Sequence, residues 1–155
     1  MTTAQAGGSA KDEWDRLSEH VAQTQAIVGG SWEPVDSSAR ACGDGGAQWA
    51  ITRLGRGTSL TERPALVEQI EREWKKYGWE LNRTAIGGDA PGVRLRFPAG
   101  GSDERRFFID IGFTVHGTTI EAQTPCAPGN VDQLNAEQYA YKHSPGIDTT
   151  PTPTN

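Results

Sequence analysis

Strict alternation of apolar and polar residues in the segment 105–126 is the feature that most constrains the fold of this chain. From Phe107 to Phe113 an apolar side chain occupies every second position, which is the period of a strand with one buried face. A turn at His116-Gly117 follows, and residues 118–123 resume the alternation. The segment therefore predicts a β-hairpin, around which the rest of the chain supplies further strands and covering helices.

Similar alternation predicts strands at 48–54, 79–86 and 93–97. The turns between the last of these and the hairpin are short enough for neighbouring strands to pair. The four strands from residue 79 onward are therefore expected to form an antiparallel meander.

Two amphipathic stretches predict helices. The first begins at about Ala10 with Ser9 as its cap and ends at Gly29-Gly30. The second runs from about 61 to 77, with Pro64 in its first turn. Its apolar stripe includes Trp74, which is expected to be central to the core.

Length and composition bound the domain organisation. A chain of 155 residues is expected to form one domain, while a hydrophobic share of 35% with Gly 19 and Pro 9 indicates that part of it is loop or tail. We expect a disordered segment at 1–9, a single α+β domain at 10–130, and a mostly disordered tail at 131–155. Within that tail, residues 132–141 are compatible with one or two polar helical turns.

Charge and hydropathy exclude two classes of partner. The net charge is −5 and the sequence pI is about 5.2, which argues against nucleic acid, because binding phosphates needs clustered Lys and Arg. No apolar run approaches the roughly 18 residues of a membrane span.

Cys42 and Cys126 are the only cysteines. They form no C-x-x-C motif, so they are either two unrelated reduced cysteines or one disulfide that closes more than half of the chain. Such a disulfide would stabilise the fold by roughly 4 kcal/mol and would require an oxidising compartment. The opening MTTAQAGGSAKDEW contains no apolar leader and no lipid-bearing cysteine, and we expect that a leader has been removed.

A set of Trp, Cys, Gly and Pro positions carries a resemblance. These residues are Trp32, Cys42-Gly43-Asp44-Gly45-Gly46, Trp74, Gly78 and Thr124-Pro125-Cys126-Ala127-Pro128-Gly129. With this order of elements, residues 12–130 resemble small secreted lipoproteins of actinobacteria. The resemblance implies a location at the outer face of the cytoplasmic membrane and pairing of the two cysteines. It implies no catalytic residue, and the lipid-bearing cysteine of such proteins is absent from this sequence.

Catalytic and metal-binding motifs are not found. His20, His116 and His143 lack the i, i+4 spacing of zinc ligands, and no G-x-S-x-G nucleophile motif occurs. Asp110 and Glu121 share one side of the hairpin, where charged residues of a solvated sheet face explain them more simply than paired catalytic carboxylates. We therefore expect no metal and no cofactor. The five Trp residues raise the possibility of a carbohydrate-stacking surface, with Trp14, Trp74 and Trp79 assigned to the core and Trp32 and Trp49 undetermined.

The sequence thus predicts an α+β fold with a four- to five-stranded antiparallel meander sheet, two helices packed on one face, and one disulfide, Cys42–Cys126. The expected function is a non-catalytic binding module of the cell envelope or extracellular space, whose partner is a protein or envelope component. The alternative is a small-molecule or hydrolytic pocket between helix and curved sheet.

One surface is a candidate for partner binding. Strand alternation places four side chains together on the sheet face that points away from the helices: Arg94, Arg96, Arg106 and Phe108. Arginines around an aromatic residue suit an acidic partner. The alternative is a solvated face whose arginines pair with Asp110 and Glu121.

Overall fold

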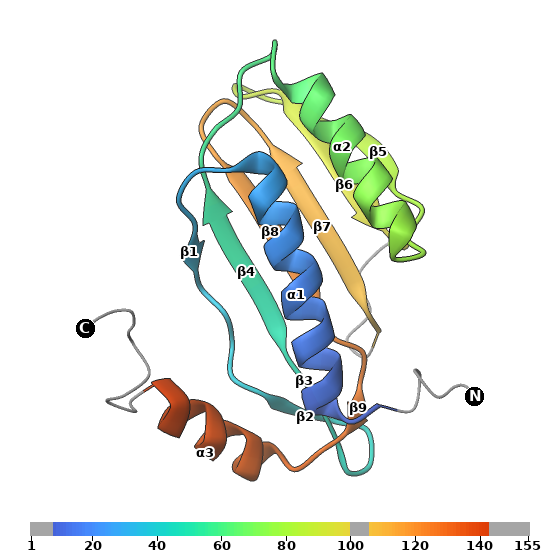
Figure 1. Cartoon of the computed structure of the whole chain (residues 1–155), viewed down its shortest axis with the longest axis vertical. Coiled ribbons are helices and arrows are strands. Elements are labelled where there is room, and N and C mark those ends of the chain that lie inside the picture. Colours follow the sequence, from blue (N-terminus) through green and yellow to red (C-terminus); the bar gives the residue numbers. More distant parts are fainter. Residues whose placement is uncertain (1–7, 100–105, 143–155) are drawn as a thin grey trace.

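The computed structural model describes residues 8–99 and 106–142 of the chain, shown in Figure 1. In these ranges the helices are α1 (Ala10–Val28), α2 (Arg63–Lys76) and α3 (Val131–Lys142). The strands are β1 (Glu33–Pro34), β2 (Arg40–Cys42), β3 (Gly46–Gln48), β4 (Ala50–Gly55), β5 (Asn82–Ile86), β6 (Gly92–Phe97), β7 (Phe108–Phe113), β8 (Thr118–Gln123) and β9 (Ala127–Pro128).

Six strands form one antiparallel sheet in the order β1-β4-β8-β7-β6-β5. Strands β5 to β8 are consecutive neighbours, which confirms the predicted meander. Three short strands form a second sheet in the order β2-β3-β9. The prediction of four to five strands is corrected to six plus three. The connector after α1 contributes β1 to the large sheet and β2 and β3 to the small one, and the segment after the hairpin contributes β9.

Helices α1 and α2 lie side by side over one face of the large sheet, as predicted (Figure 1). The Ser9 hydroxyl accepts the Asp12 backbone N–H at 3.2 Å, and the Asp12 carboxylate accepts the Ser9 N–H at 3.2 Å, so a complete capping box starts α1. Pro64 stands in the first turn of α2, where its missing N–H costs nothing. Apolar side chains of both helices meet those of the sheet in one core, whose largest fully buried members include Trp74, Phe113, Ile51 and Ile70.

Residues 131–142 form helix α3, whereas the sequence predicted that they belong to a mostly disordered tail. The helix lies at the lower end of Figure 1, and its Leu134 packs against a second apolar cluster that includes Trp49 and that Trp14 also contacts. The Asn135 side chain makes two hydrogen bonds with the backbone of Ala39, at 2.8 and 3.1 Å. Residues 1–7 and 143–155, also called disordered from sequence, lie outside the described residues.

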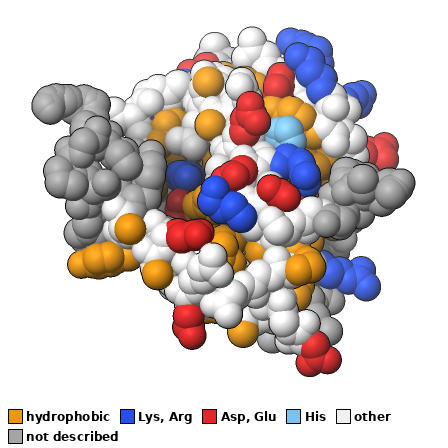
Figure 2. Space-filling model, turned by 60° about the horizontal axis from the view of Figure 1, so that its bottom comes forward, with side chains coloured by type: hydrophobic (Ala, Val, Ile, Leu, Met, Phe, Trp, Pro, Cys, Tyr) orange, Lys and Arg blue, Asp and Glu red, His pale blue; other side chains and the backbone are white. Residues whose placement is uncertain are grey.

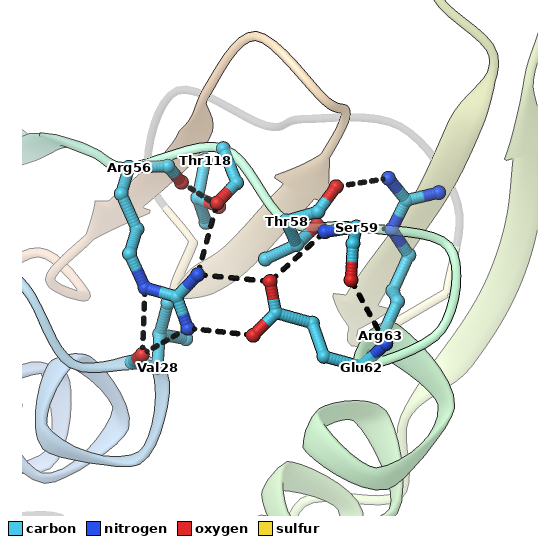
Figure 3. Close-up of polar contacts among 8 residues, drawn as sticks. Val28, Arg56, Thr58, Ser59, Glu62, Arg63 and Thr118 are labelled. Carbon is cyan, nitrogen blue, oxygen red and sulfur yellow. Dashed lines mark hydrogen bonds and ion pairs between the residues drawn. The ribbon is translucent and has the colours of Figure 1, made fainter.

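At the end of the molecule opposite α3, Arg56 forms hydrogen bonds that connect several elements (Figure 3). Its guanidinium donates twice to the Val28 carbonyl at the end of α1 and twice to the Glu62 carboxylate, and also reaches the Gly57 carbonyl, all between 2.8 and 3.1 Å. The Arg56 carbonyl accepts the Thr118 hydroxyl at 2.7 Å. One residue therefore joins α1, β8 and the approach to α2, using every N–H of the arginine fork.

Glu62 also completes a turn that leads into α2. Its carboxylate accepts the Ser59 backbone N–H at 2.9 Å, while the Ser59 hydroxyl accepts the Glu62 N–H at 3.1 Å. The hydrogen bond from Arg56 is the main reason why the pKa of Glu62 falls to about 2. The S-x-x-E pattern at 59–62 is the sequence signal for this arrangement.

Aromatic rings fill the junction between α1 and the end of α2. His20 stacks on Tyr77 with 3.7 Å between ring centroids and meets Trp79 edge-on at 5.2 Å. The Tyr77 hydroxyl donates to the Glu73 carboxylate at 2.6 Å, which lowers the pKa of Glu73. Burial lowers the pKa of His20 below its ordinary value of 6.5, against the charges of Glu19 and Glu73, while Arg16 acts in the same direction as burial.

This environment predicts a pH-dependent stability. Because the folded state disfavours protonated His20, its contribution to the unfolding free energy is complete above pH 6.5 and is lost as the pH falls through the lower, folded-state pKa. Urea denaturation between about pH 7 and about pH 5 should therefore show a steeper loss of stability for the parent than for His20→Phe, which keeps a ring on Tyr77. Equal pH slopes in the two proteins would contradict this assignment.

Candidate functional site

One face of the large sheet points away from α1 and α2, and we call it the outer face. Leu95, Ile109 and Ile111 belong to the core beneath the helices, so their neighbours along β6 and β7 point the other way. The strand register arranges these neighbours in cross-strand rows. One row holds Asn82, Arg96, Asp110, Glu121 and Thr52, and the next holds Thr84, Arg94, Gly112, Thr119 and Leu54.

Asp110 is the centre of the charges on this face. Its carboxylate contacts Arg94 Nη1 at 3.1 Å and Arg96 Nη1 at 3.3 Å, and its side chain is only 7% exposed. A nearly buried carboxylate needs compensation of this kind, because desolvation of an unpaired charge costs several kcal/mol. The two arginines therefore stabilise Asp110 in addition to any contact with a partner.

The four predicted partner-binding residues are in different situations. Arg96 is held most firmly: its side chain is 16% exposed, and its guanidinium lies 4.6 Å from the centroid of the half-buried Phe108 ring. Arg94 is 46% exposed, and among the described residues its guanidinium has one partner, the Asp110 carboxylate that its Nη1 group binds. Arg106 is exposed just before β7, and its carbonyl accepts the Gln123 amide at 2.7 Å. The structure thus brings Arg94, Arg96 and Phe108 together, around an acid that sequence reasoning placed on the same face.

Glu121 lies directly across the strand pair from Asp110. The side chain of Glu121 is exposed, and within the described part of the chain it has neither an ion-pair nor a hydrogen-bond partner. Arg94 and Arg96 both bind Asp110, so the sequence-based alternative, in which the arginines of this face pair with Asp110 and Glu121, holds for Asp110 and not for Glu121. Like charges directly opposite each other in a sheet are unfavourable, so a cationic group that binds Glu121 would also offset its repulsion with Asp110.

A depression of about 480 Å³ opens on the outer face, with Gly112 among the residues that line it. A Cβ added at Gly112 would meet nothing closer than the Ile86 Cδ1 atom at 3.5 Å, so this position leaves the floor of the depression open. Arg94 and Glu121 also line the depression, together with Thr119 and His116 at the β7–β8 turn. The depression therefore offers a cation and an anion to a ligand on the same surface.

The structure confirms the disulfide. Cys42 and Cys126 are bonded, with 5.9 Å between their Cα atoms, and they link β2 to the residue before β9. Gly46 lies beside them, and a Cβ there would come within 2.7 Å of the Cys126 sulfur. Among the described residues there is no group of three or more His, Cys, Asp or Glu side chains arranged to hold a metal ion. Nor does any helix in those ranges have the length and apolar character needed to cross a membrane.

A second concave region, which we call the α1–α3 cleft, was not predicted. It has a volume of about 520 Å³ and is lined by Lys11, Trp14, Asp15, Trp49, Leu134, Glu137 and Gln138. Trp14 and Trp49 are in contact there, with 5.0 Å between ring centroids. Sequence reasoning missed the cleft because one of its walls is α3, whose polar sequence gave no sign that it packs on the domain.

The sequence matches no protein-family model and none of the curated proteins. Among solved structures, a DUF4853 family protein from the actinobacterium Actinomyces odontolyticus is similar, with a TM-score of 0.45 and 16% identity. The similarity covers 88% of this chain and 71% of that chain.

Proposed function

We propose that this chain is a non-catalytic binding module that works outside the cytoplasm and binds its partner through the outer face. The observation that carries the proposal is that Arg94 and Glu121, which do not pair with each other, both line the outer-face depression. Within the described residues, Arg94 uses one guanidinium nitrogen to bind Asp110, and Glu121 has no hydrogen-bond or ion-pair partner. Arg94 can bind an acidic group of a protein or envelope component, the class of partner expected from the sequence, and Glu121 adds a contact for a cationic group.

The disulfide supports the location. A bond between Cys42 and Cys126 persists in an oxidising environment and is rare in the cytosol. A secreted protein or a surface lipoprotein, of host or phage origin, fits this chemistry.

The filled interior supports surface binding over a pocket between helices and sheet. Trp74 and Ile70 of α2 are fully buried against the sheet, where Phe113 and Leu95 are also fully buried. This region has the dense packing of a core. The outer-face depression and the α1–α3 cleft, in contrast, are open to the surface.

Charge reversal at Arg94 tests the proposal. Arg94→Glu should reduce capture of an envelope ligand at least tenfold, because it places a third acid beside Asp110 and Glu121. Arg96 is left in place because it alone would then hold the buried Asp110 carboxylate. The measurement is quantitative capture from solubilised envelope by the immobilised full-length chain, with the circular dichroism spectrum recorded for each variant.

Arg72→Glu is the matched control. Arg72 lies on α2, away from the outer face, and its side chain is 64% exposed in a long contact of 3.8 Å with Glu68. The same change of charge there should leave capture intact. Equal capture by Arg94→Glu and the parent would show that the outer face is not the binding surface.

A further inference from the structure

The α1–α3 cleft contains an aromatic platform that the outer-face proposal does not use. Trp49 is 2% exposed and is fixed on both sides: its backbone N–H donates to the Thr124 hydroxyl at 2.9 Å, and its indole N–H points to Gln138 Oε1 at 3.5 Å. Trp14 packs against it with the ring planes inclined at 43°. Trp14 is half-buried and lines the cleft, so part of its ring is available to a ligand.

Hydrogen-bond donors and hydrogen-bond acceptors both surround this platform. Lys11 and Asp15 form an exposed ion pair at 3.2 Å on the first turns of α1. Glu137 and Gln138 stand opposite on α3. The Gln138 oxygen is used by Trp49, but within the described residues its amide N–H groups have no partner.

Figure 2 brings this end of the molecule forward. Acidic and basic side chains are interspersed there with hydrophobic ones, so no single sign of charge dominates the visible surface. In the cleft itself, the positive charge of Lys11 is already compensated by Asp15 at its side. This arrangement does not provide the concentrated charge that selects a phosphate or a polyanion.

We propose that the α1–α3 cleft binds a pyranose sugar of a glycan. A pyranose ring has one apolar C–H face and a rim of hydroxyl groups that both donate and accept hydrogen bonds. Trp14 offers a flat apolar surface to the first, while Asp15 and Glu137 accept and Lys11 and Gln138 donate to the second. A volume of about 520 Å³ lies within the range of small-ligand sites.

Titration with defined sugars tests this site. Glucose, mannose, galactose and N-acetylglucosamine, each as monosaccharide and tetrasaccharide, are added at millimolar concentrations to the full-length chain labelled with ¹⁵N. We expect at least one sugar series to shift the indole N–H resonances of Trp14 and Trp49 in a saturable manner. The tetrasaccharide should bind with the lower Kd if the ligand is a polymer. Absence of a saturable shift with all of these sugars would overturn the proposal.

Variants decide whether the binding occurs in the cleft. Trp14→Leu should abolish the response, and Glu137→Ala should raise the Kd about tenfold by removing a hydrogen-bond acceptor. Trp14→Leu also removes core contacts and therefore could prevent folding. Glu137 is exposed, so Glu137→Ala still tests the site if the Trp14→Leu protein does not fold. Glu68→Ala on the exposed side of α2 is the control and should leave the Kd unchanged. An unaltered Kd in Glu137→Ala, or binding retained in a folded Trp14→Leu protein, would exclude the cleft.

Discussion

Replacing both cysteines, as Cys42→Ala/Cys126→Ala, should lower the free energy of unfolding by about 4 kcal/mol and the Tm by 10 °C or more. The two residues are separated by 84 positions, so the bond removes much of the conformational freedom of the unfolded chain. The closed loop contains β4, α2 and all strands of the meander. The small sheet should be affected most, since its strands have only two or three residues each.

Thermal and urea denaturation followed by circular dichroism measure this effect. The parent protein treated with a reductant should melt near the temperature of the double variant, which separates loss of the bond from loss of the buried sulfur atoms. A mass lower by two hydrogens in the untreated parent than in the reduced protein establishes that the bond was present. If the double variant melts within 2 °C of the oxidised parent, the bond contributes little to the fold.

Trp74→Ala should lower the free energy of unfolding by a similar amount, about 3–5 kcal/mol. Trp74 is 0% exposed, at the centre of the α2 stripe, and its indole N–H donates to the Thr24 hydroxyl of α1 at 3.1 Å. The Thr24 hydroxyl in turn donates to the His20 carbonyl at 3.0 Å. The residue thus combines burial of a large ring with a polar bond between the two helices.

Two further variants separate these contributions. Trp74→Phe keeps an aromatic ring but removes the N–H, and should cost about 1–2 kcal/mol. Thr24→Val leaves the buried indole N–H without an acceptor and should cost about 1–3 kcal/mol. Chemical denaturation of the three variants checks the order. A Trp74→Ala protein that melts within one or two degrees of the parent would show that α2 is not held by this side chain.

The elements predictable from sequence are those with a sustained period or a clear terminal signal. The strands β6, β7 and β8 alternate over five or more residues, and each was found within one or two residues of its expected bounds. Helix α1 was also found at its expected bounds, because Ser9 and Gly29 are clear signals for its start and its end. The outer face followed from this alternation, because the period of a strand fixes which side chains lie opposite the core.

Other parts depend on contacts that leave no local pattern. The strands β1, β2 and β3 have two or three residues, too few to show any period, and they are set by pairing with distant segments such as β4 and β9. Helix α3 has a polar sequence and is positioned by Asn135 and Leu134. The sequence placed Arg94 and Arg96 on one face, but their common partner Asp110 depends on the register between β6 and β7.

Because of the hydrogen bonds of Arg56, local unfolding costs more free energy at the end of the molecule where α1 ends and α2 begins than at the end where α3 lies. At that end, releasing α1 breaks the two hydrogen bonds from Arg56 to the Val28 carbonyl, and releasing the turn into α2 breaks the two from Arg56 to the Glu62 carboxylate. Helix α3, at the other end, is attached through Asn135, Gln138 and a few half-buried apolar side chains. Partial unfolding that spares the large sheet therefore begins at α3. A ligand that contacts both α1 and α3 acts on the most easily opened unit of the fold, so its binding energy appears as protection of α3 amides from hydrogen exchange.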